Sequence, residues 1–253
     1  MTAQRGLPDG RADGVWCRLG EPRTTVRIAS SGVDWLCLDA QHGAFDDAAV
    51  VATMQALAVL RERPPIAVRV AEVSDTLIGR ALDAGADVVI VPMVETADDA
   101  RTAAAAAHYP PAGRRSWGPM ADLWGGEVPS TAEARPELWV MIETRAGLEE
   151  VERILAVPGV AGVFVGPFDL AIGLGVELAD LLAADAPGDP LPAIVAAARR
   201  AGRSAGAFAG DPVRAERLRS LGFDRVAVAT DLSLIAAGAA AVLGSGAPAR
   251  SAY

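Results

Sequence analysis

The chain alternates short apolar runs, rich in valine, with longer segments of helical pattern from end to end. Eight of these runs have the near-continuous apolar character that is typical of strands buried on both faces. They are Val15–Leu19, Asp34–Leu38, Ile66–Val70, Val88–Val91, Leu138–Ile142, Gly162–Val165, Ser204–Phe208 and Arg225–Ala229. Eight strand–helix repeats with right-handed crossovers close most simply into a (β/α)8 TIM barrel, with an open doubly wound sheet as the alternative.

The segments between the runs predict helices, with Asp, Ser or Thr at several starts and glycine near several ends. They are Glu21–Ser30, Asp46–Leu60, Asp75–Ala84, Thr96–Ala107, Arg145–Ala156, Asp189–Ala201, Asp211–Leu221 and Leu232–Leu243. Two connections are long: Tyr109–Arg135 and the partly helical Leu174–Pro192. Long loops in compact domains are usually functional or disordered. We expect one catalytic domain over residues 14–243, with disordered segments at 1–13 and 244–253.

Composition excludes several classes of protein. The 253 residues carry a net charge of −9, which argues against the basic surface that nucleic acid requires. No apolar run reaches the roughly 18 residues of a membrane span, and the polar start lacks the apolar core of a signal peptide. Cys17 and Cys37 both lie inside apolar runs, so we expect reduced core residues. These features predict a soluble cytoplasmic protein.

The sequence contains no lysine, so all of its basic side chains are arginines. A barrel enzyme of this composition cannot form a lysine Schiff base with a carbonyl substrate. Any carbanion chemistry must therefore rely on a metal ion or on arginine.

Polar residues collect where the predicted strands end. Asp39, Gln41 and His42 follow the second strand, Arg69 lies in the third, and Glu143 follows the fifth. The sixth strand leads into Gly166, Pro167, Phe168 and Asp169. Barrel enzymes place their active sites at the carboxyl ends of the strands, so we expect these residues to converge on one rim.

Glu143 and Asp169 are the expected metal ligands. Two neighbouring carboxylates repel one another unless a cation lies between them, and hard divalent cations prefer oxygen ligands. The pair could alternatively be the acid and base of a glycosidase, but the region has few aromatic residues to bind sugar rings.

His42 is the expected catalytic base, oriented by Asp39, and a hydrogen-bonded structural histidine is the alternative. Arg69 stands among apolar neighbours, where a charge must be paired or contact a ligand. Its guanidinium suits an enolate or carboxylate oxygen, although a structural ion pair with Glu143 or Asp169 remains open. His108, at a helix end, is expected to have a capping role.

The segment Gly166–Asp169 precedes a helical turn, so its backbone N–H groups should face the space beside Asp169. A helix N-terminus next to a metal is a suitable place for a substrate carboxylate. The eighth predicted strand lacks the glycines of a barrel phosphate site, so a phosphorylated substrate is not expected.

Five stretches together resemble the HpcH/HpaI aldolase family, the metal-dependent class II pyruvate aldolases of the phosphoenolpyruvate/pyruvate barrel superfamily. The stretches are Asp34–Gly43, Val88–Arg101, Tyr109–Arg115, Val140–Thr144 and Gly159–Gly175. The resemblance implies a divalent metal (Mg²⁺, Mn²⁺ or Co²⁺) bound by Glu143 and Asp169 and chelated by pyruvate. It also implies that Arg69 stabilises the enolate oxygen and that His42 relays a proton through water.

In the family, an aspartate supplied by a neighbouring subunit forms a dyad with the histidine, and it corresponds here to Asp83. The resemblance further implies a homo-oligomer, a hexamer built as a trimer of dimers, with the C-terminal helix packed on a neighbouring subunit. The chain departs from many relatives at Gln41 and Met141, which replace Glu and Gln, and at Phe168, which replaces a small residue. Trp117, in the long loop, and Phe168 are expected to narrow the substrate pocket.

The leading functional hypothesis is reversible cleavage of a 4-hydroxy-2-oxo acid to pyruvate and an aldehyde. Two alternatives remain open. One is another reaction on the same metal-enolate site, an oxaloacetate-type decarboxylase or a biosynthetic carbon–carbon lyase or synthase. The other is a non-catalytic barrel that binds an oxo acid. The intact set of polar residues argues against this second alternative.

Overall fold

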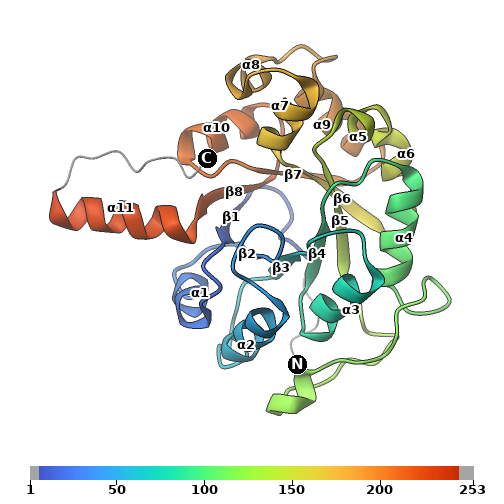
Figure 1. The fold of residues 1–253 in the computed structure, drawn as a ribbon, viewed down its shortest axis with the longest axis vertical. Helices are drawn as coiled ribbons and strands as arrows, with labels where there is room; N and C mark the ends of the chain where they lie inside the picture. The colour runs from blue at the N-terminus through green and yellow to red at the C-terminus, as the bar shows by residue number, and fades with distance from the viewer. Residues whose placement is uncertain (1–5, 245–253) are drawn as a thin grey trace.

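A computed structural model describes residues 6–244. Eight parallel strands close into a barrel in chain order, and helices surround it (Figure 1). This confirms the predicted (β/α)8 fold and excludes the open sheet. The strands are β1 (Ala12–Cys17), β2 (Trp35–Asp39), β3 (Ile66–Arg69), β4 (Val88–Val91), β5 (Glu137–Ile142), β6 (Val160–Val165), β7 (Ser204–Phe208) and β8 (Arg225–Thr230).

The helices follow the predicted order with two differences. The predicted helix Arg145–Ala156 is divided at Glu150, where the backbone leaves the helical conformation, and the connection after β6 holds two short helices. The helices are α1 (Pro22–Ala29), α2 (Asp47–Leu57), α3 (Asp75–Asp83), α4 (Ala97–Ala107), α5 (Arg145–Glu149), α6 (Val151–Leu155), α7 (Pro167–Leu174), α8 (Leu178–Ala183), α9 (Pro190–Arg200), α10 (Pro212–Ser220) and α11 (Asp231–Leu243).

The inside of the barrel is filled by large aromatic side chains, two of which lie against a glycine of the neighbouring strand. A Cβ atom at Gly14 would lie 2.1 Å from the ring of Trp35, and one at Gly206 would lie 2.7 Å from the ring of Phe164. Trp35, Trp139 and Phe164 are almost completely buried. Interiors pack to near-crystal density, so the two glycines provide the volume that these rings occupy.

A second apolar layer lies between the strands and the helices. Ile78 and Leu82 of α3 and a row of alanines in α4 are buried there. Alanine has the highest helix propensity and a small side chain, which lets α4 pack closely against the barrel wall. The two cysteines are buried and free, as predicted.

The predicted boundaries change at the N-terminus. β1 begins at Ala12, three residues earlier than predicted, because it pairs with β8 from that residue onward. Leu7 is buried, and its backbone N–H donates to the Glu137 carboxylate at 3.3 Å. Ala12 and Asp13 therefore belong to the barrel wall, while residues 1–5 and 245–253 of the predicted disordered segments lie outside the described residues.

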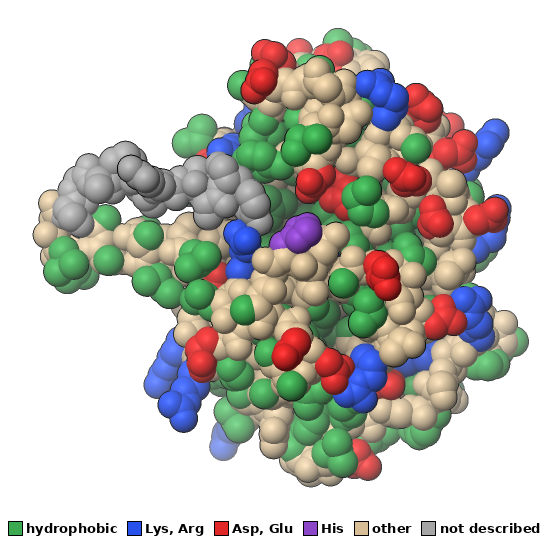
Figure 2. Space-filling view, in the orientation of Figure 1, with side chains coloured by type: hydrophobic (Ala, Val, Ile, Leu, Met, Phe, Trp, Pro, Cys, Tyr) green, Lys and Arg blue, Asp and Glu red, His purple; other side chains and the backbone are tan. Residues whose placement is uncertain are grey.

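Helix α11 projects away from the barrel (Figure 1). Its first residue, Asp231, is its one buried residue, whereas Leu232, Ile235, Val242 and Leu243 are exposed. Figure 2 shows hydrophobic side chains along this projecting helix. Within residues 6–244, no helix combines the length and the apolar character that crossing a membrane would require.

Candidate active site

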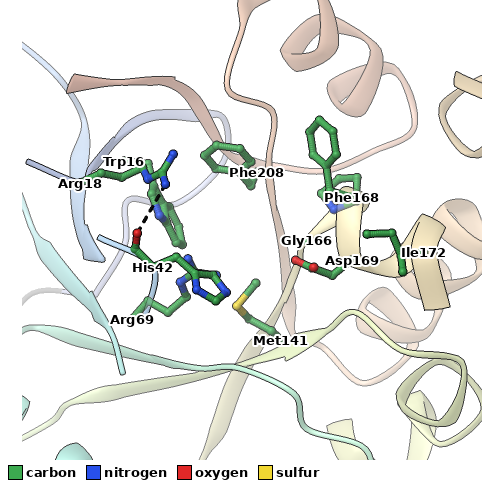
Figure 3. Close-up of a pocket in the computed structure, with 11 residues that line it drawn as sticks. Trp16, Arg18, His42, Arg69, Met141, Gly166, Phe168, Asp169, Ile172 and Phe208 are labelled. Atoms are coloured by element: carbon green, nitrogen blue, oxygen red, sulfur yellow. Dashed lines mark hydrogen bonds between the residues drawn. The ribbon is translucent and has the colours of Figure 1, made fainter. Parts of the chain in front are cut away.

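A cavity of about 420 Å³ opens at the carboxyl ends of the strands (Figure 3). Its size falls within the range of small-molecule sites. It is lined by Trp16, Arg18, His42, Arg69, Met141, Gly166, Pro167, Phe168, Asp169, Ile172 and Phe208. Figure 2 shows a histidine beside a hollow near the middle of this face, with charged side chains of both signs nearby.

Arg69 is held by Asp39, and not by Glu143 or Asp169 as the ion-pair alternative supposed. Its Nε and Nη2 atoms donate to the two Asp39 carboxylate oxygens at 2.9 and 2.7 Å. The two residues are neighbours in the β2–β3 register, so the barrel wall itself brings them together. The guanidinium also lies over the Trp16 ring, 5.2 Å from its centroid. These contacts fix Arg69 at the cavity. Asp39 accepts from the Nε and Nη2 atoms, so Nη1 lies on the other edge of the guanidinium.

Burial opposes ionisation of Asp39, but the hydrogen bonds and charge of Arg69 and the backbone N–H of His42 outweigh it. The pKa of Asp39 is therefore lowered. Its Oδ1 atom accepts from the backbone N–H groups of Gln41 and His42, both at 3.1 Å. Asp39 thus holds the backbone of the loop that carries His42. Within residues 6–244 it forms no hydrogen bond with the imidazole ring that it was predicted to orient. Among residues 6–244, no hydrogen bond reaches that ring, which is exposed at the cavity.

Glu143 follows β5 and is 3% exposed. Its Oε1 atom accepts from the backbone N–H of Met93 at 2.7 Å. Met93 has a φ of 54°, a left-handed conformation that non-glycine residues seldom adopt and that recurs at functional sites. Burial and the charge of Asp169 raise the pKa of Glu143, against the opposing effects of Met93 and Arg69.

Glu143 and Asp169 face the same point above Gly166. A Cβ atom built on Gly166 would lie 2.9 Å from Glu143 Oε2 and 3.5 Å from Asp169 Oδ2. Two carboxylates that face one small space, with the charge of Asp169 contributing to the raised pKa of Glu143, are the donor set that a divalent cation would satisfy. Within residues 6–244, no third His, Cys, Asp or Glu joins them. A magnesium-type ion, which is commonly bound by one or two carboxylates with substrate and water, fits this arrangement.

Gly166→Ala should weaken metal binding without unfolding the protein. The backbone at Gly166 has φ −95° and ψ 92°, which alanine adopts freely. The added methyl group would displace Glu143 Oε2, whose partner oxygen is tied to Met93. We expect the metal dissociation constant to rise by about tenfold or more, as for changes in the groups that orient metal ligands. Isothermal titration with Mn²⁺ measures it.

Gly188→Ala is the matched control, because a Cβ there would meet no atom within 4 Å. Unchanged metal affinity in Gly166→Ala, with normal affinity in the control, would contradict the assignment of this space to the metal.

The residues before Asp169 line the cavity as predicted from their position. Gly166 caps α7, and Pro167 is its first residue. Phe168 lies at the rim, with the guanidinium of Arg214 5.0 Å from its ring centroid. The first N–H groups of a helix lack intrahelical partners, and α7 begins beside Asp169 at this end of the cavity.

Three predicted site residues do not line this cavity. The Gln41 side-chain oxygen is buried and has no hydrogen-bond partner among residues 6–244. Asp83 pairs with Arg115 at 2.7 Å, and its carbonyl accepts from Met120. Trp117 is half exposed and packs on Tyr109.

The position of Trp117 has a topological cause. Its loop leads from α4 into β5, and the chain enters each parallel strand at its amino end. The loop therefore lies on the rim opposite the cavity, and the expectation that it covers the site within one chain is wrong. His108, whose ring nitrogen lies 3.3 Å from the Gly159 carbonyl, lies at the end of α4 as predicted.

Sequence reasoning missed Trp16, Arg18, Ile172 and Phe208 as cavity residues. Trp16 and Phe208 pack edge to face with their centroids 5.5 Å apart and form the apolar side of the cavity. Arg18 went unnoticed because the first strand was predicted to end at Leu19, whereas β1 ends at Cys17. With the correct end, Arg18 becomes the first residue after a strand, which is the position that identified the other site residues.

Residues 13–237 match the family model described as HpcH/HpaI aldolase/citrate lyase. A hydroxypyruvate/pyruvate aldolase from Roseovarius nubinhibens is 36% identical over 230 residues, covering 88% of this chain and 87% of the relative. A 2-keto-3-deoxy-L-rhamnonate aldolase from Klebsiella pneumoniae is 36% identical over 242 residues, covering 91% and 87%.

Two solved structures share the fold of this chain. An HpcH/HpaI aldolase/citrate lyase family protein from Burkholderia cenocepacia has a TM-score of 0.82 at 32% identity, covering 93% of this chain and 94% of the other. A citrate lyase beta subunit from Mycobacterium tuberculosis, complexed with oxaloacetate and magnesium, shares the fold with a TM-score of 0.53 at 19% identity. That match covers 90% of this chain and 95% of the other.

Proposed function

The chain belongs to the HpcH/HpaI aldolase/citrate lyase family, and on that premise we propose that it is a class II aldolase that cleaves a 4-hydroxy-2-oxo acid to pyruvate and an aldehyde. The observation that carries this proposal is one cavity that joins a carboxylate pair, a fixed guanidinium and an exposed imidazole. The decarboxylase, synthase and non-catalytic alternatives are not favoured, because the relatives of 36% identity are named aldolases.

Glu143 and Asp169 would hold a divalent metal, for which Mg²⁺, Mn²⁺ and Co²⁺ are the candidates. When bound, such an ion supplies Lewis acidity toward the carboxylate and oxo oxygens of the pyruvate half. The paired carboxylates above Gly166 support this assignment, as does the magnesium in the citrate lyase beta subunit of the same fold.

Arg69 would stabilise the negative charge that develops on the C2 oxygen. In cleavage, the C3–C4 bond breaks, its electrons remain on the pyruvate half, and the C4 hydroxyl loses its proton to become the aldehyde. The Nη1 group of Arg69 can donate to the C2 oxygen while Nε and Nη2 stay on Asp39. The held guanidinium needs no reorganisation as charge develops.

His42 would remove the C4 hydroxyl proton through a water molecule and return a proton to C3. Its ring is exposed at the cavity, and its loop is fixed by Asp39. Gly166, Pro167 and the backbone of Phe168 would lie beside the pyruvate carboxylate at the start of α7.

A neighbouring subunit would complete the site. Asp83 is assigned to pair with the His42 of another copy, and a Cβ on Gly118 would lie 3.0 Å from Asp83. Trp117 precedes that glycine, so a copy that presents Asp83 would bring Trp117 with it. The exposed apolar side chains of α11 support its packing on a neighbour. Light scattering should give a hexamer, whereas a monomer at micromolar concentration would contradict the assembly.

Phe168→Ala should broaden the range of accepted aldehydes. The side chain lies at the cavity rim beyond Asp169, where the aldehyde half would lie, and a misfitted apolar group costs about 1–3 kcal/mol. We expect bulky aldehydes to gain roughly tenfold or more in kcat/KM, with deuterium exchange into the pyruvate methyl group preserved. Loss of deuterium exchange into pyruvate with an unchanged aldehyde preference would instead show that Phe168 supports the metal site.

The proposed function is tested with pyruvate, a divalent metal and a panel of aldehydes. The aldolase should exchange the methyl protons of pyruvate with deuterium in the absence of aldehyde. It should then form 4-hydroxy-2-oxo acids when aldehydes are added. Absence of both reactions with Mg²⁺, Mn²⁺ and Co²⁺ would refute it.

A further inference from the structure

A contact between Phe168 and Arg214 joins two neighbouring segments of the rim. Phe168 is the second residue of α7, and Arg214 lies in the first turn of α10. These segments follow β6 and β7, which are neighbours in the barrel. The Arg214 guanidinium lies over the Phe168 ring, 5.0 Å from its centroid. The position of a cavity residue on one segment is thus linked to a charge on the next.

Arg214 is held by its own segment. The Asp211 carboxylate, which caps α10, accepts from the backbone N–H of Arg214 at 2.9 Å and pairs with its Nε at 3.1 Å. The Nη1 group also donates to the Ala209 carbonyl at 3.5 Å. A guanidinium donates in its own plane, so these acceptors take its edges while a flat face lies toward the Phe168 ring. Arg214 is therefore a fixed support on which the ring rests.

The Phe168 ring occupies one of two places that its position allows. In Figure 3 it points away from Met141 and His42, whereas the next residue, Asp169, points into the cavity. The ring is half-buried, and side chains of this kind change between a few staggered rotamers. The cavity of about 420 Å³ has room for an aromatic ring beside Phe208. Burial against that apolar wall favours an inward rotamer, and the Arg214 face favours the observed one.

Given the aldolase function on which this step depends, we propose that Arg214 is a positioning residue that holds Phe168 at the rim. It thereby keeps the aldehyde side of the cavity open. Cation–π contacts correspond to roughly a twofold to thirtyfold bias between two placements of a ring. Without Arg214 the ring spends more time inside the cavity and competes with the aldehyde half. The pyruvate half, between Arg69 and the carboxylate pair, keeps its contacts.

The test uses butanal, which is uncharged, so that loss of the Arg214 charge has no direct effect on the aldehyde. Arg214→Met keeps the length of the side chain and removes its charge and flat face. The KM for butanal in condensation with pyruvate should rise about threefold to tenfold, while kcat and deuterium exchange into pyruvate stay near the wild-type values. Arg214→Lys keeps a cation for the ring and should restore part of the lost affinity.

The double variant Phe168→Ala/Arg214→Met shows whether the effect passes through the ring. It should have the butanal KM of Phe168→Ala alone, because no ring remains to be held. Arg200→Met is the matched control, since it removes an exposed arginine that pairs with Glu152 outside the cavity, and its KM should not change.

An unchanged butanal KM in Arg214→Met would overturn the role of Arg214 and leave the aldolase function intact. An equal rise in KM with and without the Phe168 ring would also overturn it, because Arg214 would then act by another route. Loss of deuterium exchange in Arg214→Met would contradict the assignment to the aldehyde side. Absence of exchange and of condensation in the wild type would overturn both proposals.

Discussion

Removal of divalent cations should reduce aldol turnover to the background rate. The chain has no lysine, so a lysine Schiff base is not available to replace the metal. The Lewis acid role of a bound metal is worth several kcal/mol, and each 1.36 kcal/mol changes the rate about tenfold. Dialysis against EDTA followed by an assay of the cleavage of a 4-hydroxy-2-oxo acid measures the loss, and Mg²⁺, Mn²⁺ or Co²⁺ should restore the activity.

Asp169→Asn is the companion variant, because it removes one of the two carboxylate charges above Gly166 while keeping the shape of the side chain. It should need much higher metal concentrations for the same rate. Treatment of the wild type with pyruvate and borohydride should leave the protein mass unchanged. Full activity after exhaustive chelation would refute the metal-dependent function.

Arg69→Ala should lower both catalysis and stability, which makes it the substitution with the largest combined effect. Loss of one donor to a developing oxyanion costs about 10²-fold or more in kcat. Removing one partner of a buried pair leaves Asp39 uncompensated, which typically costs about 3–5 kcal/mol in the free energy of unfolding. The side chains of Arg69 and Asp39 are 8% and 1% exposed, so solvent would compensate little. Arg69→Lys should restore little of the lost kcat and stability, since an ammonium group lacks the planar fork of donors that binds both Asp39 oxygens.

Arg63→Ala separates the two effects. Arg63 pairs with the buried Asp87, which accepts from the backbone N–H of Ile66 at the amino end of β3. Its loss should lower stability while kcat measured below the melting temperature stays near the wild-type value. Near-normal kcat in Arg69→Ala, with only the lowered stability, would assign Arg69 a structural role.

The strand order and most of the rim residues could be predicted because each follows from local pattern. Valine-rich runs and helix caps identify the repeats, and a polar residue at the end of such a run marks the carboxyl rim. Glu143 and Asp169 were found in this way. The prediction depended on strand ends, however, and an error of two residues at β1 was enough to hide Arg18.

Contacts across strands could not be predicted in the same way. The pairing of Arg69 with Asp39 depends on the β2–β3 register, which places them side by side and which no local pattern specifies. The bond from Met93 to Glu143 depends on a left-handed backbone at a residue other than glycine. The wrong placement of Trp117 was avoidable, because a connection from a helix to the next parallel strand always reaches the amino end of that strand.

The pairing of Arg69 with Asp39 inside the barrel wall has a consequence for redesign. Both residues belong to strands, whereas Arg18, Phe168 and Ile172 lie beyond strand ends, in a loop or in α7. Grafted or randomised segments at β1–α1 and α7 would thus leave in its register the guanidinium that we propose to serve the pyruvate half. Libraries confined to these two segments should yield catalysts that differ in the aldehyde they accept while sharing one nucleophile.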